Sequence, residues 1–565
     1  MRIKTSFNFL FFLVFISNLL FLAFASADSL NQSAIFFVNP EYEYSNRDRV
    51  SAALRKISDK AYWYISDDFW AGLTESEKSL FSSKLDELAG EFDSRIYPIE
   101  TQFWGPEPNP GVDNDSRITI LISRLVDFAG GYFDSSHLYK KNQVSDSNER
   151  EMVFLNSSSI ASERAKVFLA HEFQHLLAFY QKDILRNSSE ETWLNEARAE
   201  YAPRQLGYDD FYPNSNIRRR VFAFEQDPSD PLAEWKNQSS DYGAITLFAY
   251  YLVDQFGNRI LLDTLRSAKF GIESIDEYLI LNGFTERFSN VFSYWTIANI
   301  LNDPVVNSRF AYIAQNLKDF KIPPTQSYTI SGIGTAILVS NSVKDFEPSW
   351  YEFSTPVNSG FGLNLKIEFL AQGEGSSAIG GGIASDAGTK FRVPYIAFKI
   401  NGEKKVGTLP MGSSESPQFD GSNGTLFLKN FGADFYKVIL IPASHTKTSG
   451  FTDNDSNYLF NLKVQLTEEY KEAAPFPTPT PSPTPALSSQ LAVQDLINQI
   501  NALQNQIAQL KDKTIQVSRP KPGSTLSLSR DLFVSSRGED VKWLQEFLTS
   551  QGVYPEALKT GYFGS

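Results

Sequence analysis

The chain has 565 residues, of which 42% are hydrophobic and 21% charged, so it is globular in composition and too long for a single core. Its net charge is −14 and we find no basic cluster in the mature chain, which argues against binding to nucleic acid. It contains no cysteine, and a large domain does not need disulfides.

The first residues have the features of an export signal. Arg2 and Lys4 precede an almost wholly apolar run, Phe7–Phe24, which is followed by small residues. We therefore predict a signal peptide over residues 1–27 and a secreted or cell-envelope protein that leaves the membrane after cleavage. Because the apolar run is nearly long enough to span a bilayer, an uncleaved anchor is the alternative.

Residues 28–322 are expected to form one α+β domain. Helical stretches such as Arg49–Ile65 are predicted first, followed by short strands at Ile118–Ser123 and Glu151–Asn156. The remainder of this domain is predicted to be mainly helical.

An apolar helix predicted around residues 161–180 contains the pattern H-E-x-x-H, formed by His171, Glu172 and His175. Histidines four residues apart lie on one helix face, so both imidazoles can bind one ion. Zn²⁺ favours imidazole nitrogen, and a catalytic zinc site keeps three protein ligands and an open position for water. Glu172 can take a proton from that water. The alternative is a core helix with two incidental histidines.

A second predicted helix, capped by Ser189 or Thr192, places Glu196 and Glu200 on one face. Glu196 can complete a His, His, Glu metal site. Glu200 can accept a hydrogen bond from a ligand histidine and hold its tautomer, a common arrangement around metal ligands. A solvated acidic helix face is the alternative.

The segments H-E-F-Q-H and W-L-N-E-A-R-A-E resemble the gluzincin metallopeptidases, with a spacing similar to that of thermolysin. With the stretches at residues 118–122, 130–133 and 148–154, they look most like the hyicolysin family and its bacterial relatives. The sequence departs from relatives at Ala197, where glycine is common, and at Glu200, where thermolysin has aspartate.

The resemblance implies a zincin-like fold that binds Zn²⁺ through His171, His175 and Glu196, with Glu172 as catalytic base. It also implies an edge strand before the active-site helix that pairs with the substrate backbone, which we place at Met152–Asn156.

Tyr242 opens a predicted apolar helix that ends near Gly257. Gluzincins commonly supply a tyrosine or histidine after the third ligand to stabilise the negative oxygen of the transition state. The only downstream histidine, His445, falls in a predicted β domain, so the resemblance favours Tyr242 as this donor. A core aromatic is the alternative.

The remaining sequence predicts four further segments. Residues 323–470 alternate short β-rich runs with turn residues and are expected to form an all-β sandwich. Residues 471–487 are a Pro/Thr-rich linker, and residues 488–513 carry a heptad seam at 493–510 that fits a parallel dimer or a helical spacer. Residues 520–565 resemble part of a three-helix peptidoglycan-binding-like module, and a small amphipathic tail without a ligand is the alternative.

These features favour a secreted zinc endopeptidase that acts on protein or peptide substrates and is held at the cell wall by its C-terminal module. Two alternatives stay open: a hydrolase of peptidoglycan stem peptides, and a non-catalytic surface protein on a zincin scaffold.

Overall fold

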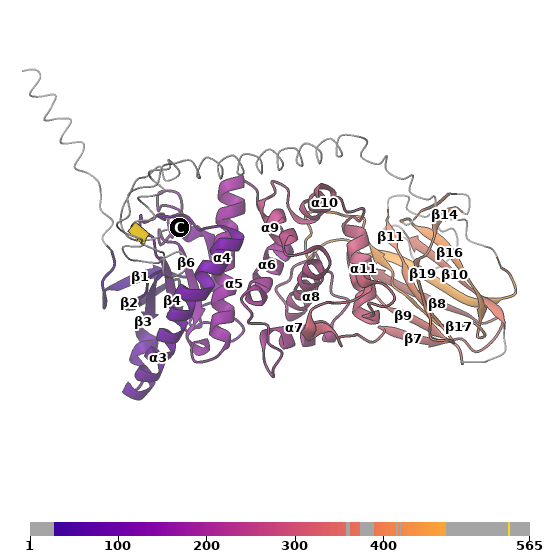
Figure 1. Ribbon diagram of the computed structural model, residues 1–565, viewed down its shortest axis with the longest axis horizontal. Coiled ribbons are helices and arrows are strands. Elements are labelled where there is room, and N and C mark those ends of the chain that lie inside the picture. The colour runs from indigo at the N-terminus through magenta and orange to yellow at the C-terminus, as the bar shows by residue number, and fades with distance from the viewer. Residues whose placement is uncertain are drawn as a thin grey trace, which may run out of the picture. The chain divides into compact units, whose positions relative to one another are not determined.

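The computed structural model describes residues 27–356, 362–372, 389–413, 416–418, 420–470 and 541–542 (Figure 1). The predicted linker, coiled coil with its dimer seam, nearly all of the C-terminal module and all but the last residue of the signal peptide lie outside these residues. The chain divides into two compact units, residues 1–477 and 478–565, and almost all described residues belong to the first. None of the described helices is both long and apolar enough to cross a membrane.

A six-stranded sheet forms the N-terminal part of the first unit, in the order β1-β2-β3-β4-β6-β5. Strands β3, β4 and β6 are parallel, and the other neighbours are antiparallel. The strands are β1 (Ser33–Phe37), β2 (Arg49–Ile57), β3 (Ala61–Ser66), β4 (Ile118–Ser123), β5 (Gly131–Phe133) and β6 (Met152–Asn156).

Two predictions for this sheet are wrong. The helix expected over Arg49–Ile65 is the hairpin of β2 and β3. All six residues of β3 are buried, and a fully buried strand shows no alternation that separates it from a buried helix. The edge strand expected at Met152–Asn156 is internal, because β5 pairs with its outer side through Gly131 and Leu155. The free edge beside the H-E-x-x-H helix therefore belongs to β5.

The two faces of the sheet have separate cores. Trp63 and Val153 face the helices α3 (Glu75–Glu91), α4 (Tyr97–Trp104) and α5 (Arg164–Phe179). Tyr64 and Phe154 face the opposite side, in a smaller core closed by β1 and the segment after it. A short helix, α2 (Asp67–Ala71), follows β3. The strands Ile118–Ser123 and 152–156 and the H-E-x-x-H helix are confirmed.

A helical half follows the sheet, with α8 at its centre in contact with α6, α7 and α9. As predicted, α8 is an apolar helix that stops at Gly257, which has a φ of 80°. The helix α6 begins at Thr192 with Glu191 as its N-cap residue, so neither predicted cap is used. The helices are α6 (Thr192–Gln205), α7 (Asn216–Gln226), α8 (Ser239–Phe256), α9 (Arg259–Arg266), α10 (Gly271–Leu281) and α11 (Phe288–Leu301).

From Gln326 to Thr467 the regular elements among the described residues are all strands, in agreement with the predicted all-β character. Most belong to one sheet with the path β13-β12-β17-β16-β10-β19-β8, while β9 pairs with β17 and β7. The strands are β7 (Gln326–Thr329), β8 (Ala336–Val343), β9 (Tyr351–Ser354), β10 (Leu363–Gln372), β11 (Phe391–Arg392), β12 (Pro394–Lys399), β13 (Lys404–Thr408), β14 (Met411–Ser413), β15 (Ser416–Gln418), β16 (Asn423–Phe431), β17 (Phe435–Leu440), β18 (Ala443–Ser444) and β19 (Tyr458–Thr467).

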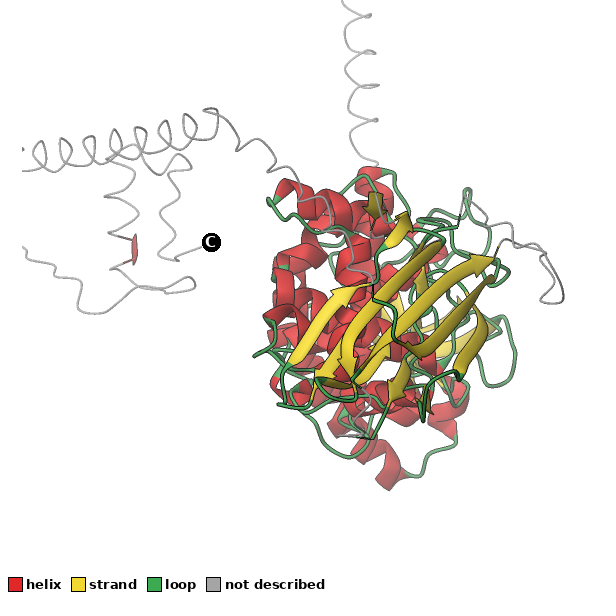
Figure 2. Cartoon of the chain, turned by 90° about the vertical axis from the view of Figure 1, so that its right-hand side faces the viewer, coloured by secondary structure: helices red, strands yellow, loops and turns green. Residues whose placement is uncertain are grey.

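This β part packs directly on the helical half (Figure 2). Alternate residues of β17 point to opposite sides: Val438 joins a core shared with β10 and β19, whereas Ile439 joins the core of the helices. Trp350, which is fully buried, donates from Nε1 to the carbonyl oxygen of Thr296 on α11 at 3.0 Å. The β part and the helical half therefore share apolar surface that separation would expose to water.

Replacing Trp350 by alanine should lower the free energy of unfolding of the whole unit by about 3–5 kcal/mol, the usual effect of deleting a buried tryptophan. The midpoint of urea unfolding, followed by circular dichroism, measures this change. Leu338→Ala is the control, because Leu338 is 71% exposed on β8 and should change stability by no more than about 0.5 kcal/mol. A wild-type midpoint for Trp350→Ala would show that the two parts do not depend on this contact.

Candidate metal centre

The helix α5 is largely buried. Besides Lys166 near its start, Arg164, Phe168, His171 and Phe179 are partly exposed, and the spacing of these four places them on a single stripe that also includes His175. The edge strand β5 runs beside this stripe. Gly130 packs on the ring of Phe168, Gly131 packs on Glu172, and the rings of Phe133 and Phe179 are 6.1 Å apart. The stripe therefore forms the floor of a cleft with a free strand edge along it.

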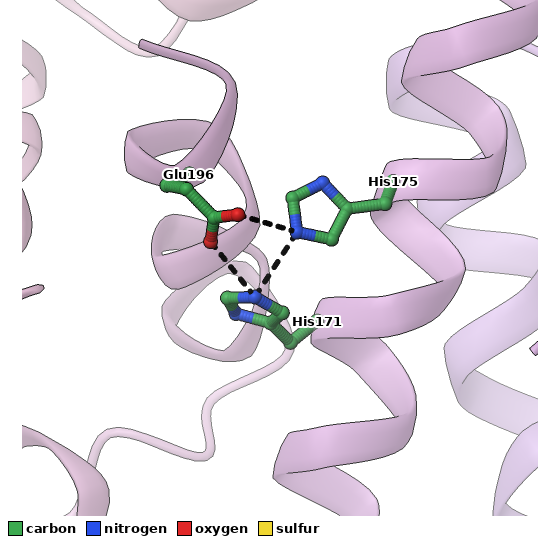
Figure 3. A group of neighbouring side chains, drawn as sticks. All are labelled: His171, His175 and Glu196. Carbon is green, nitrogen blue, oxygen red and sulfur yellow. Dashed lines mark hydrogen bonds and ion pairs between the residues drawn. The ribbon is translucent and has the colours of Figure 1, made fainter. Parts of the chain in front are cut away.

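Three potential metal ligands meet at the middle of this floor (Figure 3). The Nε2 atoms of His171 and His175 are 3.1 Å apart, and the Glu196 carboxylate lies 3.2 Å from the first and 3.4 Å from the second. One atom from each side chain lies within 4.8 Å of the others. In the described part of the chain this is the one group of three or more such residues that could hold a metal ion.

The electrostatics of these side chains favour a cation between them. Burial opposes charge on His171, but its hydrogen bond to Glu196 and the charges of Glu172, Glu196 and Glu200 raise its pKa to about 9. Burial likewise opposes charge on Glu196, but the two histidines hold its pKa far below the usual value. Two imidazoles and a carboxylate are also the donor types that Zn²⁺ binds, so the residues fit a metal ion.

Glu200 lies beside the ring nitrogen of His171 that does not face the other ligands. Its Oε1 lies 3.4 Å from His171 Nδ1, so it can accept the proton that a ligand bound through Nε2 carries on Nδ1. Arg220 donates to both oxygens of Glu200 at 2.5 and 2.9 Å, and Thr246 donates at 3.2 Å. Although burial opposes its charge, Arg220 keeps the pKa of Glu200 below the ordinary value. Glu200 therefore stays ionised as a hydrogen-bond acceptor.

Sequence reasoning missed these supporting residues. Arg220 lies on α7 and Thr246 on α8, and neither belongs to a motif with H-E-x-x-H. Asn195 was also missed, although it adjoins Glu196: its Nδ2 lies 3.3 Å from His175 Nδ1. An amide flip would present its oxygen to that nitrogen. The adjacency of Asn195 to the third ligand was the one available signal.

Glu172 is 6% exposed and lies against the edge strand. A Cβ on Gly131 would come within 2.8 Å of Glu172 Cγ and 2.6 Å of the Phe154 carbonyl oxygen, so only glycine allows this close approach. Burial raises the pKa of the Glu172 carboxyl, although the histidines beside it act in the opposite direction. Glu172 is therefore placed between the metal ligands and the strand edge, with a raised proton affinity.

Tyr242 lies near the ligands, but its hydroxyl already donates a hydrogen bond to another residue. It donates to Asn237 Oδ1 at 3.0 Å, and the guanidinium of Arg220 lies 4.3 Å from the centre of its ring. Burial, and next the charge of Glu196, raise the pKa of Tyr242. Its assignment as the transition-state donor stays a prediction.

A second tyrosine, missed in the sequence, approaches from the sheet side. Tyr42 follows β1, and its ring stacks on Tyr132 of β5 at 4.9 Å. Burial raises the pKa of Tyr42, and the nearby negative charges of Glu172 and Glu196 raise it further. Tyr42 and Tyr242 both contact Asn237, so the two hydroxyls lie near one another beside the ligands.

The cleft widens at its Phe179 end into a cavity of about 440 Å³. His175 and Asn195 line its inner wall, and Phe133 and Asp134 from the end of β5 line its outer wall. There is therefore space for a ligand next to the metal ligands.

Comparisons with known proteins assign no family to this chain. No family model and no curated protein matches it. Three solved structures are similar to about a quarter of the chain. The first is Salmonella Typhimurium PliG, a periplasmic inhibitor of g-type lysozyme, with 13% identity over 25% of this chain and 98% of that chain and a TM-score of 0.15. The second comprises the CBM22-1–GH10 modules of Clostridium thermocellum xylanase 10B, with 11% identity over 25% of this chain and 23% of that chain and a TM-score of 0.14. The third is the SPBc2 prophage-derived protein YomS, with 16% identity over 24% of this chain and 99% of that chain and a TM-score of 0.13. At these TM-scores the likenesses bear on neither fold nor function.

The full-length chain should bind about one Zn²⁺, as expected for a single three-ligand site. His175→Ala should abolish this binding, and Glu200→Gln should weaken it about 10–100-fold because the imidazole of His171 loses its charged partner. Elemental analysis and competition with a chromophoric chelator measure both effects. His445→Gln, remote from the site, is the control and should keep full affinity. Zinc retained by His175→Ala would contradict the assigned ligands.

Proposed function

We propose that this chain is a zinc-dependent endopeptidase. The observation that supports it most strongly is the meeting of His171, His175 and Glu196 around one point, with the buried Glu172 between them and a free strand edge. A ligand set alone would also suit a structural metal. The open cleft and the neighbouring proton acceptor favour catalysis, because structural zinc sites are closed by four protein ligands.

In the proposed mechanism, the metal ion and the chain's own residues perform different tasks. When bound, zinc supplies a Lewis acid that lowers the pKa of water and withdraws electrons from the scissile carbonyl. Glu172 accepts the proton of the attacking water at its carboxylate and returns it to the leaving amine. Its position against Gly131 of the edge strand suits this role.

The strand β5 is the proposed binding surface for the substrate backbone. Its outer edge is free among the described strands, and an extended peptide can add to it through main-chain hydrogen bonds. Gly130 and Gly131 keep this edge close to Phe168 and Glu172. A scissile bond on this edge would therefore lie beside Glu172, whatever the side chains of the substrate.

Glu172→Gln should keep zinc and lower kcat by about 10²–10⁴-fold, because it removes the proton acceptor but no ligand. Casein turnover with and without chelator, together with zinc content, measures this change. Glu163→Gln is the matched control, since Glu163 precedes the same helix and its side chain is 74% exposed. Near wild-type turnover in Glu172→Gln would exclude the proposed base. Purified sacculi assayed in parallel would test cleavage of stem peptides.

Tyr242→Phe should lower kcat and kcat/KM together by about a hundredfold with little change in KM, the pattern for a donor used only in the transition state. Tyr42→Phe provides the comparison, because the Tyr42 hydroxyl also lies near Asn237 and the charges of Glu172 and Glu196. If Tyr242→Phe has no effect on kcat, Tyr242 is a packing residue, and an effect confined to Tyr42→Phe would identify the donor instead.

A further inference from the structure

The cavity at the Phe179 end of the cleft continues the face of α5 that carries His175. It is lined by His175, Ala178, Phe179 and Lys182, whose spacing of three and four residues places them on one side of the helix. Lys182 belongs to the π-helical turn η4 (Tyr180–Ile184), which continues α5. At 1.5 Å per residue, His175 and Lys182 lie about 10 Å apart along the axis. The cavity therefore begins at a metal ligand and is long enough for an extended side chain.

Lys182 lines the inner end of this cavity, but its N–H groups are already used. Its Nζ donates to the carbonyl oxygens of Thr264, Ser267 and Lys269 at 3.0, 3.2 and 2.6 Å. An ammonium group has three N–H donors, and these bonds use all of them. Lys182 therefore has no donor left for an anion in the cavity.

Glu190 also lines the cavity, and only 4% of its side chain is exposed. Its Oε1 accepts hydrogen bonds from the backbone N–H groups of Glu191 and Gly271 at 3.0 and 2.6 Å. Its Oε2 is buried and accepts none. Arg198 Nη1 and Lys182 Nζ lie 2.8 and 3.3 Å from this oxygen and offset its charge, but neither nitrogen donates to it. Glu190 therefore keeps a free acceptor oxygen at the wall of the cavity.

Two further carboxylates line the cavity, those of Asp134 and Asp183. Asp134 follows the end of β5 and accepts from the backbone N–H of Ser136 at 2.9 Å, whereas Asp183 accepts from the Ser189 hydroxyl at 2.7 Å. Among the residues that the structure describes, no cationic side chain lies within ion-pair distance of either carboxylate. The charged groups of the cavity therefore offer acceptors for hydrogen bonds but no free donor.

We propose that this cavity is a subsite for a lysine or arginine side chain next to the scissile bond, an inference that rests on the proposed function. Because His175 lines the cavity, a peptide bond held at the metal ligands would have a neighbouring side chain at its mouth. Ammonium and guanidinium groups supply only donors, and their hydrogen bonds to carboxylates are stronger than those between neutral groups. Asp134 and Asp183 would bind the charged end, and Glu190 Oε2 would gain a donor.

Cleavage-site mapping in a proteome-derived peptide library tests the subsite with the full-length, zinc-loaded chain. Lysine and arginine should be enriched at one of the two positions that flank the cleaved bond. Either position supports the subsite, because the cavity adjoins a metal ligand and not a particular end of the peptide. Cleavage without this enrichment, or with apolar or acidic residues enriched instead, would overturn the subsite while leaving the peptidase function intact.

A matched peptide pair with lysine or norleucine at the enriched position then tests the residues, because norleucine keeps the stem and lacks the charge. In the wild type, kcat/KM should be about tenfold higher for the lysine peptide, the effect of one charge-assisted hydrogen bond, and salt should reduce this ratio. In Asp134→Asn/Asp183→Asn the ratio should fall below about twofold, because neutral amides replace both unpaired carboxylates. Asp86→Asn is the control, since Asp86 is an exposed residue of α3 that pairs with Lys56, and should keep the wild-type ratio. A lysine preference that survives the double substitution would overturn the assignment.

If no peptide is cleaved, the proposed function fails, and equilibrium binding to the full-length, zinc-loaded chain decides the subsite. The probes are two fluorescently labelled short peptides that differ only in a central lysine or norleucine. Tighter binding of the lysine peptide that disappears in Asp134→Asn/Asp183→Asn would support the subsite independently of catalysis. Equal binding of both peptides would overturn it.

Discussion

The buried pair of Glu200 and Arg220 is the interaction on which the site depends. A carboxylate with 2% of its side chain exposed is costly unless charged donors surround it, and Arg220 supplies two of them. Because these groups come from α6 and α7, with Thr246 from α8, the pair joins three helices around His171. The orientation of one metal ligand is thereby coupled to the packing of the helical half.

The edge strand imposes the second constraint. Gly130 and Gly131 allow β5 to approach α5 so closely that any Cβ would collide with Phe168, Glu172 or the Phe154 carbonyl. The outer side of β5 is unpaired among the described strands. A base, three potential ligands and a row of free backbone groups consequently share one cleft. Neither glycine contributes a side chain to the chemistry, yet both determine where it can occur.

Carboxylates surround the histidines at the centre of the cleft. Glu196 lies within 3.4 Å of both imidazoles, and Glu200 lies 3.4 Å from His171. The β part packs against the helices through Trp350 and Ile439, and it thereby covers apolar surface of the same unit. It also contacts the helix that carries Glu196, because the backbone N–H of Gly450 donates to Glu191, the N-cap residue of α6.

The ligand candidates could be predicted from the sequence because helix geometry is local. Spacing of four residues places His171 with His175, and Glu196 with Glu200, on single faces regardless of the rest of the fold. Strand order could not be predicted in this way. The buried strand β3 has no alternation to identify it, and β5 has only three residues, so the edge was assigned to the wrong strand. The roles of Arg220 and Tyr42 depend on contacts between distant segments, and such contacts exist only after the helices pack against the sheet.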